Sequence, residues 1–420
     1  MKELNYDVTV IGAGPAGLAA AGAAKRNGTE KVLIVERDTD CGGILQQCIH
    51  SGFGLTYFNE ELTGPEYASR FIKSAREKGV DILLDTMALS VDQAGIVVCS
   101  NPQDGIVTVR TKAVVLAMGC RERTRANLRI PGTRPAGIYT AGTAQRLINR
   151  QNEMVGREVV ILGSGDIGMI MARRLTLEGA KVKAVVEIMD YLAGLTRNRV
   201  QCLDDFGIPL LLRHTVTRIH GNRRVEAVTV CEVDQNRKPI LSTAQDISCD
   251  TLLLSVGLIP ENELTRACGI AIDPVTNGPS VNQFMQTSVS RVFACGNVVH
   301  VNDLVDNVSQ ESEKAGASAA LYAQGKLPEA ASEIPCAAGE GIRYVCPQTI
   351  VPVPEGGVRL CFRVLRPGKD VTLTALQGDE ILTSKKARRV SPGEMEHLDI
   401  DMAKLTGEGI RIVAKEAVSV

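Results

Sequence analysis

Tryptophan is absent from this sequence of 420 residues, and aromatic residues make up only 3% of it. The hydrophobic cores must therefore be built from aliphatic side chains. Positive and negative charges almost cancel, with 47 Lys and Arg against 48 Asp and Glu. This balance argues against nucleic acid or an anionic membrane surface as a partner.

Long apolar runs are missing as well. None approaches the ~20 residues needed to cross a membrane, and the first residues lack a charged segment followed by a cleavable apolar core. We therefore expect a soluble, cytoplasmic protein without a membrane span.

The cysteines lack the spacing of a metal site or of a C-x-x-C redox pair. There are twelve of them, scattered along the chain, and the five histidines do not cluster with them. In a chain of this size, such cysteines indicate reduced thiols that pack as small apolar residues. We expect no metal site.

What the sequence does contain is a strand, turn, helix and strand close to its start. The apolar run VTVI (8–11) leads into GAGPAG (12–17), small residues follow, and KVLIVE (31–36) ends on an acid. This pattern indicates a dinucleotide-binding βαβ unit, in which the glycines admit a pyrophosphate at the helix N-terminus and the acid binds a ribose diol. The predicted binding residues here are Gly12, Gly14, Pro15, Ala16, Gly17, Glu36 and Arg37.

A second copy of this pattern lies in the middle of the chain. A strand at 158–162 leads into GSGDIG (163–168), and KVKAVVE (181–187) ends on Glu187, with the same separation between first glycine and acid. Two such units predict two bound dinucleotides. An acid at this strand end favours an unphosphorylated ribose and hence NADH, although Arg197 and Arg199 leave NADPH open. The predicted binding residues here are Gly163, Gly165, Asp166, Ile167, Gly168 and Glu187.

The length predicts two to three domains, and the two βαβ units indicate an α/β fold. Beyond residue 325 the sequence changes: five prolines punctuate residues 328–354, and β-like runs then alternate with turns. We expect a proline-rich linker and a small antiparallel β domain at 336–420.

Three further motifs complete an ordered set: AMG (117–119), GLIP (257–260) and ACGN (294–297). With the two βαβ units, they make the first 325 residues resemble FAD/NAD-linked reductases of the pyridine nucleotide-disulfide oxidoreductase superfamily. The resemblance implies two Rossmann-like domains, an NAD-binding domain (121–255) inserted into an FAD-binding domain (1–120 and 256–328). It also implies cofactor contacts for Gly43, Ala117, Gly119, Gly257, Gly296 and Asn297.

Two features depart from that superfamily's pattern. Asn297 stands where the superfamily usually has an aspartate that binds the ribityl chain; it keeps a carbonyl acceptor but loses one charge. Cys41 and Cys48 are six residues apart, which is not the spacing of the superfamily's redox pair. A dithiol relay is therefore not expected.

The segments 43–54, 117–125 and 131–145, with the extra β domain, resemble one branch more closely. That branch holds the FAD/NAD-binding subunits of sarcosine oxidase and of opine dehydrogenase, hydrogen cyanide synthase subunits, and a subunit paired with a glycerol-3-phosphate-dehydrogenase-like protein. The resemblance implies a partner flavoprotein dehydrogenase, with an iron-sulfur or cysteine-rich subunit as a further partner.

Cys48 and His50 lie in the glycine-rich loop that the resemblance places beside the flavin. A thiolate next to a histidine can act as a charge-transfer donor or proton shuttle, which makes the two residues candidates for catalysis. The alternative is that Cys48 is a packed small residue and His50 a polar loop side chain.

Together these features predict an FAD-dependent oxidoreductase that transfers hydride between NAD(H) and flavin. We expect it to be the electron-transfer subunit of a dehydrogenase acting on a small hydroxy acid, amino acid or polyol phosphate. The alternatives are a stand-alone NADH oxidase or thiol/disulfide reductase that uses Cys48, and an assembly subunit with a vestigial NAD site. The intact glycines at 163–168 argue against the last of these.

Overall fold

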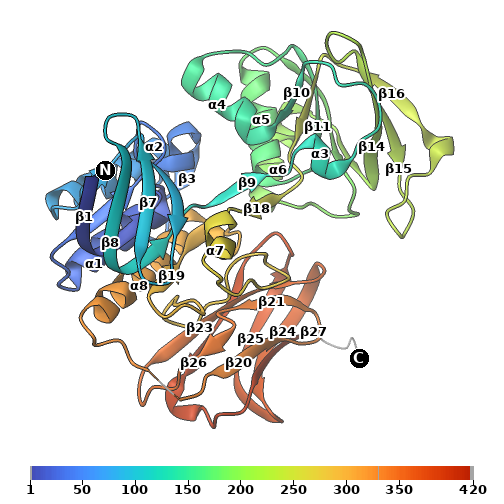
Figure 1. The fold of residues 1–420 in the computed structure, drawn as a ribbon. Helices are drawn as coiled ribbons and strands as arrows, with labels where there is room; N and C mark the ends of the chain where they lie inside the picture. The colour runs from blue at the N-terminus through green and yellow to red at the C-terminus, as the bar shows by residue number, and fades with distance from the viewer. Residues whose placement is uncertain (1, 330, 417–420) are drawn as a thin grey trace. The chain divides into compact units, whose positions relative to one another are not determined.

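The computed structural model describes residues 2–329 and 331–416. The chain divides into two compact units (Figure 1). Unit 1 comprises residues 1–120 and 260–420, and unit 2 comprises residues 121–259. The chain passes between them in two short strands that pair with each other, β9 (Cys120–Glu122) and β18 (Leu258–Pro260).

A mixed seven-stranded sheet forms the centre of unit 1. Its order is β5-β2-β1-β8-β7-β6, with β19 paired to β8. The neighbours β5, β2, β1, β8 and β19 are parallel, whereas β6 and β7 add an antiparallel extension. The strands are β1 (Lys2–Ile11), β2 (Val32–Val35), β5 (Asp81–Leu83), β6 (Met87–Val91), β7 (Ile96–Asn101), β8 (Gly105–Leu116) and β19 (Val292–Ala294).

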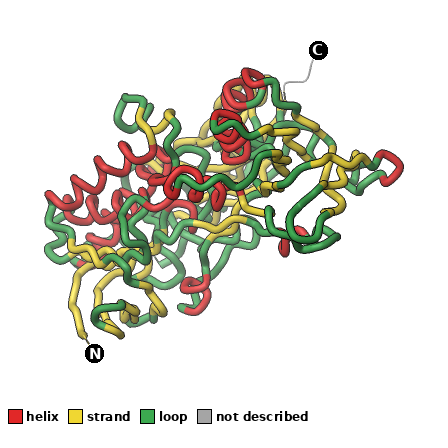
Figure 2. Tube along the Cα trace, turned by 90° about the horizontal axis from the view of Figure 1, so that it is seen from above, coloured by secondary structure: helices red, strands yellow, loops and turns green. Residues whose placement is uncertain are grey.

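Helices α1 (Pro15–Arg26) and α8 (Val305–Ala323) pack together beside this sheet. Their small residues allow backbone contact: a Cβ atom at Gly316 would lie 1.9 Å from the Ala20 carbonyl oxygen. Figure 2 shows helices stacked on one side of the strands that begin at the N-terminus. The other elements of this part are β3 (Ser51–Phe53), β4 (Leu62–Thr63), α2 (Gly64–Glu77) and α7 (Glu263–Ala267).

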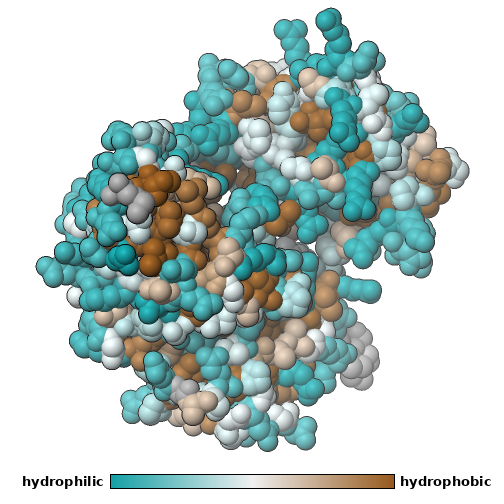
Figure 3. Space-filling view, viewed as in Figure 1, coloured by the Kyte–Doolittle hydropathy of each residue, from teal (hydrophilic) through white to brown (hydrophobic). Residues whose placement is uncertain are grey.

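The antiparallel extension of the sheet, formed by β6, β7 and the start of β8, exposes apolar side chains. Met87 and Leu89 on β6 and Ile106 on β8 are all more than one third exposed. The strand register aligns Met87 with Ser100 and Ser100 with Ile106, so these residues share one face of the sheet. Figure 3 shows hydrophobic residues gathered on this part of unit 1.

Unit 2 has a five-stranded parallel sheet of order β10-β17-β11-β12-β13 and a three-stranded antiparallel sheet β14-β15-β16. The inner strands β11 and β17 are buried apolar runs, as expected for strands covered on both faces. The elements are α3 (Arg125–Leu128), β10 (Ile138–Thr140), α4 (Ala141–Gln151), β11 (Glu158–Leu162), α5 (Asp166–Leu177), β12 (Lys181–Glu187), α6 (Thr196–Cys202), β13 (Leu210–Leu212), β14 (His214–His220), β15 (Ala227–Glu232), β16 (Gln245–Ser248) and β17 (Thr251–Leu254).

The C-terminal residues of unit 1 form two β-sheets, β22-β20-β27-β24-β25 and β21-β23-β26, around a separate aliphatic core. Strand pairing is antiparallel except between β20 and β27. The first of these strands begins at Ile334, two residues before the β domain expected at 336–420, and residues 334–350 hold three strands among the prolines. The strands are β20 (Ile334–Ala338), β21 (Ile342–Cys346), β22 (Thr349–Ile350), β23 (Gly357–Val364), β24 (Gly368–Gln377), β25 (Glu380–Val390), β26 (Glu396–Asp401) and β27 (Ile410–Glu416).

The α/β class predicted from the sequence is confirmed by these parallel and mixed sheets. Among the described helices, none combines the length and hydrophobicity that a membrane crossing requires.

Candidate functional site

The turn between β1 and α1 contacts a buried acid, Glu36. Glu36 lies just after β2 and is 7% exposed. One of its carboxylate oxygens accepts a hydrogen bond from Ala13 N at 2.6 Å, and the other accepts from Asp38 N at 2.8 Å. Each carboxylate oxygen has a second acceptor position, so the acid retains the capacity to bind a ribose diol.

Residues far apart in the sequence meet at this turn. Gly12 has a φ of +106°, and a Cβ atom there would lie 2.5 Å from the Ala117 carbonyl oxygen. A Cβ atom at Gly296 would lie 2.9 Å from Ala16 Cβ, and one at Gly43 would lie 3.0 Å from Gly14 Cα. Gly42 N donates to Ala13 O at 2.8 Å. The predicted residues Ala117, Gly296 and Gly43 are thus assembled around the glycine turn of unit 1.

The N-terminus of α1 fits an anion. Its N-cap residue Gly14 makes no side-chain capping bond, Pro15 stands in the first turn, and that turn contains no acidic residue. A Cβ atom at Gly14 would meet no atom within 4 Å, so the space beside the turn is open. Backbone N–H groups and the positive end of the helix dipole face this space. These residues therefore fit the pyrophosphate of a dinucleotide.

The turn between β11 and α5 repeats this construction in unit 2. Glu187 is 4% exposed. It accepts hydrogen bonds from Ser164 N at 2.8 Å, Ser164 Oγ at 2.7 Å and Met189 N at 2.9 Å. A Cβ atom at Gly163 would lie 2.0 Å from the Ser255 carbonyl oxygen, so this turn also touches the end of a neighbouring strand. The four remaining predicted residues, Gly165, Asp166, Ile167 and Gly168, form the start of α5.

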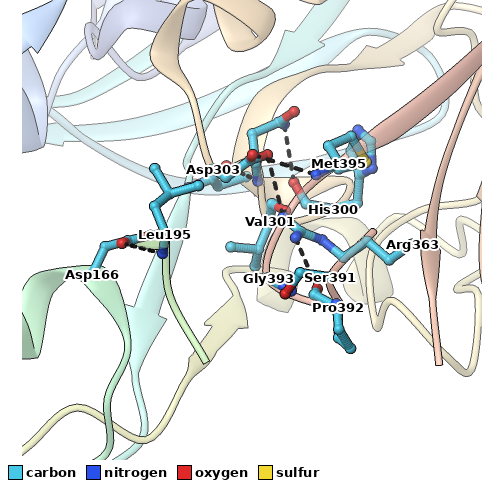
Figure 4. A network of polar contacts seen from close by, with 12 residues as sticks. Asp166, Leu195, His300, Val301, Asp303, Arg363, Ser391, Pro392, Gly393 and Met395 are labelled. Atoms are coloured by element: carbon cyan, nitrogen blue, oxygen red, sulfur yellow. Dashed lines mark hydrogen bonds and ion pairs between the residues drawn. The ribbon is translucent and has the colours of Figure 1, made fainter. Parts of the chain in front are cut away.

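Asp166 distinguishes the second turn from the first. Its Oδ1 accepts hydrogen bonds from Leu195 N at 2.8 Å (Figure 4) and from Asn198 Nδ2 at 2.7 Å. Gly194 N donates to Ser164 O at 3.1 Å, so the loop after β12 is tied directly to the turn. The carboxylate stands at a helix N-terminus, where it competes electrostatically with a bound phosphate.

Asn297 follows β19 at the end of the second motif of unit 1. Its Oδ1 accepts from Asn302 N at 2.9 Å, and its Nδ2 donates to Cys120 Sγ at 3.7 Å. The partly buried amide therefore organises the loop that leads to α8. Arg37 is exposed directly after Glu36, while Gly119 and Gly257 lie where the chain passes between the units.

The loop that holds Cys48 and His50 begins with a short 3-10 helix, Gly43–Gln47. Cys48 Sγ donates to Ile44 O at 3.3 Å, and the His50 ring lies 5.0 Å from that of Phe53. Desolvation raises the pKa of the Cys48 thiol to about 12, so the thiol is protonated at neutral pH. Burial also raises the pKa of Cys41. These features favour the packed alternative for Cys48; the catalytic roles of Cys48 and His50 stay predictions.

Sequence reasoning missed a carboxylate that holds this loop in place. Asp306, in the first turn of α8 and 4% exposed, accepts hydrogen bonds from Gly54 N, Thr56 N and Tyr57 N at 2.8 to 3.1 Å. Thr56 Oγ1 donates to it as well. The signal available in the sequence was an aspartate near a helix start, which does not reveal its distant partners.

The cysteines and acids of the described residues form no metal site. No group of three or more His, Cys, Asp or Glu side chains has suitable geometry in residues 2–329 and 331–416. None of the twelve cysteines forms a disulfide, and nine of them are buried.

A family model for pyridine nucleotide-disulphide oxidoreductase matches residues 6–320. The chain therefore belongs to this family, whose members use FAD and NAD(P)H. The structural fit of the turn at 12–17 to a dinucleotide agrees with this membership.

Three comparisons illustrate the range of related proteins. Hydrogen cyanide synthase subunit HcnB of Pseudomonas protegens is 24% identical over 320 residues, which are 70% of this chain and 66% of that protein. The CoA-dependent NAD(P)H sulfur oxidoreductase of Pyrococcus abyssi is 26% identical over 322 residues, 72% of this chain and 65% of that protein. This chain therefore spans just under two thirds of each relative's length.

Among solved structures, thioredoxin reductase from T. acidophilum matches with a TM-score of 0.62 and 23% identity. The match covers 76% of this chain and 99% of the reductase chain. At this identity the likeness shows the α/β fold.

Proposed function

We propose that this chain transfers hydride between NADH and FAD, with FAD at the turn of unit 1 and NADH at the turn of unit 2. The observation that carries the proposal is the duplicated turn, in which a buried acid, Glu36 or Glu187, accepts a hydrogen bond from the second residue of the glycine motif. Bound FAD would supply the redox chemistry, and the protein would supply position and electrostatics.

Glu187 supports NADH over NADPH. Its buried carboxylate lies at the strand end where the ribose of the nicotinamide cofactor would bind, and a 2′-phosphate there would be repelled. Arg199, which the sequence left open as a phosphate ligand, lies 3.5 Å from Asp204 in an ion pair.

The test is anaerobic mixing of the flavin-containing protein with NADH. Bleaching of the flavin absorbance is expected, and it should need a higher concentration of NADPH than of NADH. An oxidised flavin at saturating NADH would overturn the proposal.

We further propose that the electrons pass to or from a partner flavoprotein that oxidises a small hydroxy acid, amino acid or polyol phosphate. The subunit name of the relative HcnB supports a multi-subunit arrangement. An iron-sulfur or cysteine-rich subunit remains part of this proposal. Purification of the tagged chain from its native host, followed by identification of the co-purifying chains and cofactors, tests it.

A second candidate is a thiol or persulfide reductase that uses Cys48. The NAD(P)H sulfur oxidoreductase among the relatives supports it, as does the partial exposure of Cys48. The raised pKa of the Cys48 thiol opposes it, because a thiolate is the reactive form. Loss of disulfide or persulfide turnover in Cys48→Ser, with flavin reduction preserved, would favour this candidate over the first.

A further inference from the structure

An arginine of the C-terminal β-sheets reaches the loop between β19 and α8. Arg363 on β23 donates from Nη2 to Val301 O at 2.9 Å and lies 3.5 Å from Asp303 Oδ1 (Figure 4). Its Nη1 donates to Pro392 O at 3.0 Å. The Arg363 and Asp303 side chains are only 11% and 8% exposed, so water cannot readily replace these contacts.

The same loop is tied to Asn297. Asn302, which lies between Val301 and Asp303, donates its backbone N–H to Asn297 Oδ1 at 2.9 Å. Met395 N, also from the C-terminal part, donates to Asp303 Oδ2 at 3.3 Å. Arg363 and Met395 therefore hold the loop that orients the Asn297 amide.

A second series of polar contacts connects the C-terminal β-sheets to Gly296. Tyr344 OH on β21 lies 3.4 Å from His300 Nδ1. His300 Nε2 lies 2.7 Å from Glu311 Oε2 on α8, and Glu311 Oε1 accepts the Gly296 N–H at 2.7 Å. His300 is 1% exposed and the Glu311 side chain 14%, so the centre of this chain of contacts is enclosed. A buried network of this kind fixes its members in one arrangement when every polar atom has a partner.

Both series of contacts end on the strand-end pair Gly296 and Asn297. Gly296 in turn approaches Ala16 at the start of α1. We propose that the C-terminal β-sheets form a brace for the flavin site, in which Arg363, Tyr344 and Glu311 are positioning residues that fix Asn297 and Gly296. This inference rests on the proposed placement of FAD in unit 1.

The brace gives the C-terminal sheets a role in cofactor binding without any direct contact to FAD. Loss of Arg363 would leave Val301 O without its buried donor and Asp303 with Met395 N, which weakens the hold of the loop on the Asn297 amide. Weaker FAD binding and a changed flavin environment follow, because preorganised contacts bind more tightly than mobile ones.

The experiment compares two arginines on the same face of β23. Arg359 is also paired with an aspartate, Asp399, but those side chains are 42% and 60% exposed. Purified holoprotein carrying Arg363→Met, Tyr344→Phe or Glu311→Gln is compared with Arg359→Met. The readouts are the dissociation constant for FAD, the visible spectrum of the bound flavin and the unfolding midpoint of the FAD-free protein.

We expect Arg363→Met to weaken FAD binding about tenfold and Tyr344→Phe and Glu311→Gln about threefold, each with a shifted flavin spectrum. Arg359→Met should match the wild-type protein in FAD affinity and in the flavin spectrum. If Arg363→Met does not fold, Tyr344→Phe, which keeps the buried ring, tests the proposal by its FAD affinity and flavin spectrum.

Two outcomes overturn the brace. If the three variants bind FAD as Arg359→Met does and show its flavin spectrum, the inference fails while the proposed function stands. A wild-type protein that binds no FAD would overturn both.

Discussion

The two glycine turns share their backbone construction and differ at the first residue of the helix. In each, an acid at the end of the second strand binds the second residue of the motif and the residue two positions after itself. In each, a later glycine donates to the carbonyl of that same motif residue, Gly42 in unit 1 and Gly194 in unit 2. Helix α1 then begins with Pro15, whereas α5 begins with Asp166.

The residue at this position decides whether a bound phosphate meets a carboxylate at the helix N-terminus. Pro15 contributes neither a charge nor a competing hydrogen bond at the helix N-terminus, so an anion there meets only backbone donors. Asp166 places a carboxylate at the equivalent point and holds it with Leu195 N and Asn198 Nδ2. We infer that unit 1 retains its dinucleotide as a resident cofactor, while unit 2 releases its dinucleotide after each reaction.

The largest effect is expected where the turn of unit 1 touches its own helix. In Gly17→Ala the new Cβ atom would lie 1.8 Å from the Gly12 carbonyl oxygen. We expect a loss of about 3 kcal/mol or more in the free energy of unfolding and no retained FAD. Urea unfolding followed by circular dichroism measures it. Gly22→Ala, whose Cβ atom would be 3.7 Å from its nearest neighbour, is the control and should stay folded and yellow.

Substitution of Gly14 or of Gly165 by alanine should weaken the binding of one dinucleotide and spare the other. Gly14→Ala has open space for its methyl group, so the fold should persist while FAD affinity falls about tenfold, on the order of 1.4 kcal/mol. Gly165→Ala should weaken NADH binding by a similar factor and spare FAD. Fluorescence titration of both ligands against both variants tests this. Equal effects of one variant on both ligands would refute the assignment of one dinucleotide to each turn.

Removal of the charge at Glu187 should alter cofactor preference. Glu187→Gln keeps a carbonyl acceptor for the Ser164 donors but no longer repels a 2′-phosphate. We expect the affinity for NADPH relative to NADH to rise about fivefold, roughly 1 kcal/mol. Measurement of both dissociation constants for the wild type and the variant tests this, and an unchanged ratio would place the ribose elsewhere.

A smaller gain is expected when the second turn is made more like the first. Asp166→Asn keeps a carbonyl oxygen for Leu195 N and removes the charge at the start of α5. NADH should bind about twofold to fivefold more tightly, in line with the ~0.3–1 kcal/mol of a charge at a helix end. The mirror change Pro15→Asp should weaken FAD binding. Tighter FAD binding in Pro15→Asp would contradict the comparison.

The smallest effect on flavin reduction is expected at Cys48. Cys48→Ser should leave the rate of reduction by NADH unchanged, as stopped-flow absorbance can show. The folded state raises the thiol pKa from its ordinary 9.0 to about 12, so the protonated thiol stabilises the folded state fully below pH 9 and progressively less up to pH 12. The unfolding midpoint of the wild type should therefore fall more between pH 8 and pH 11 than that of Cys48→Ser. An equal fall in both proteins would show that the thiol titrates normally.

Local signals made the two glycine turns predictable. An apolar strand, a glycine motif and an acid at a fixed distance specify neighbouring residues, and the structure has strands at Glu158–Leu162 and Lys181–Glu187 where the sequence indicates them. The meeting of Ala117 and Gly296 with the first turn followed from the family pattern and not from periodicity.

Other parts of the site depend on distant partners and were not predictable. Asp306 binds residues 54–57, and Arg363 binds residues 301 and 303, but no repeating pattern links these segments. The pKa of Cys48 depends on the desolvation of its sulfur, which sequence alone does not define. The β domain was expected from residue 336, but its first strands, at 334–350, were not indicated individually because prolines interrupt the pattern there; prolines are tolerated at strand ends and edges.

The order of the strands in unit 1 has a consequence for synthesis of the chain. Strand β19 pairs with β8, and all of unit 2 lies between them in the sequence. While the ribosome makes unit 2, residues Val114–Leu116 of β8 have no β19 beside them, and their backbone groups form an open strand edge. Unit 1 can be completed only after every residue of unit 2 has left the ribosome. In the proposed placement of FAD, which includes Gly296 beside the first turn, loading of the dinucleotide is therefore among the last events in the maturation of the protein.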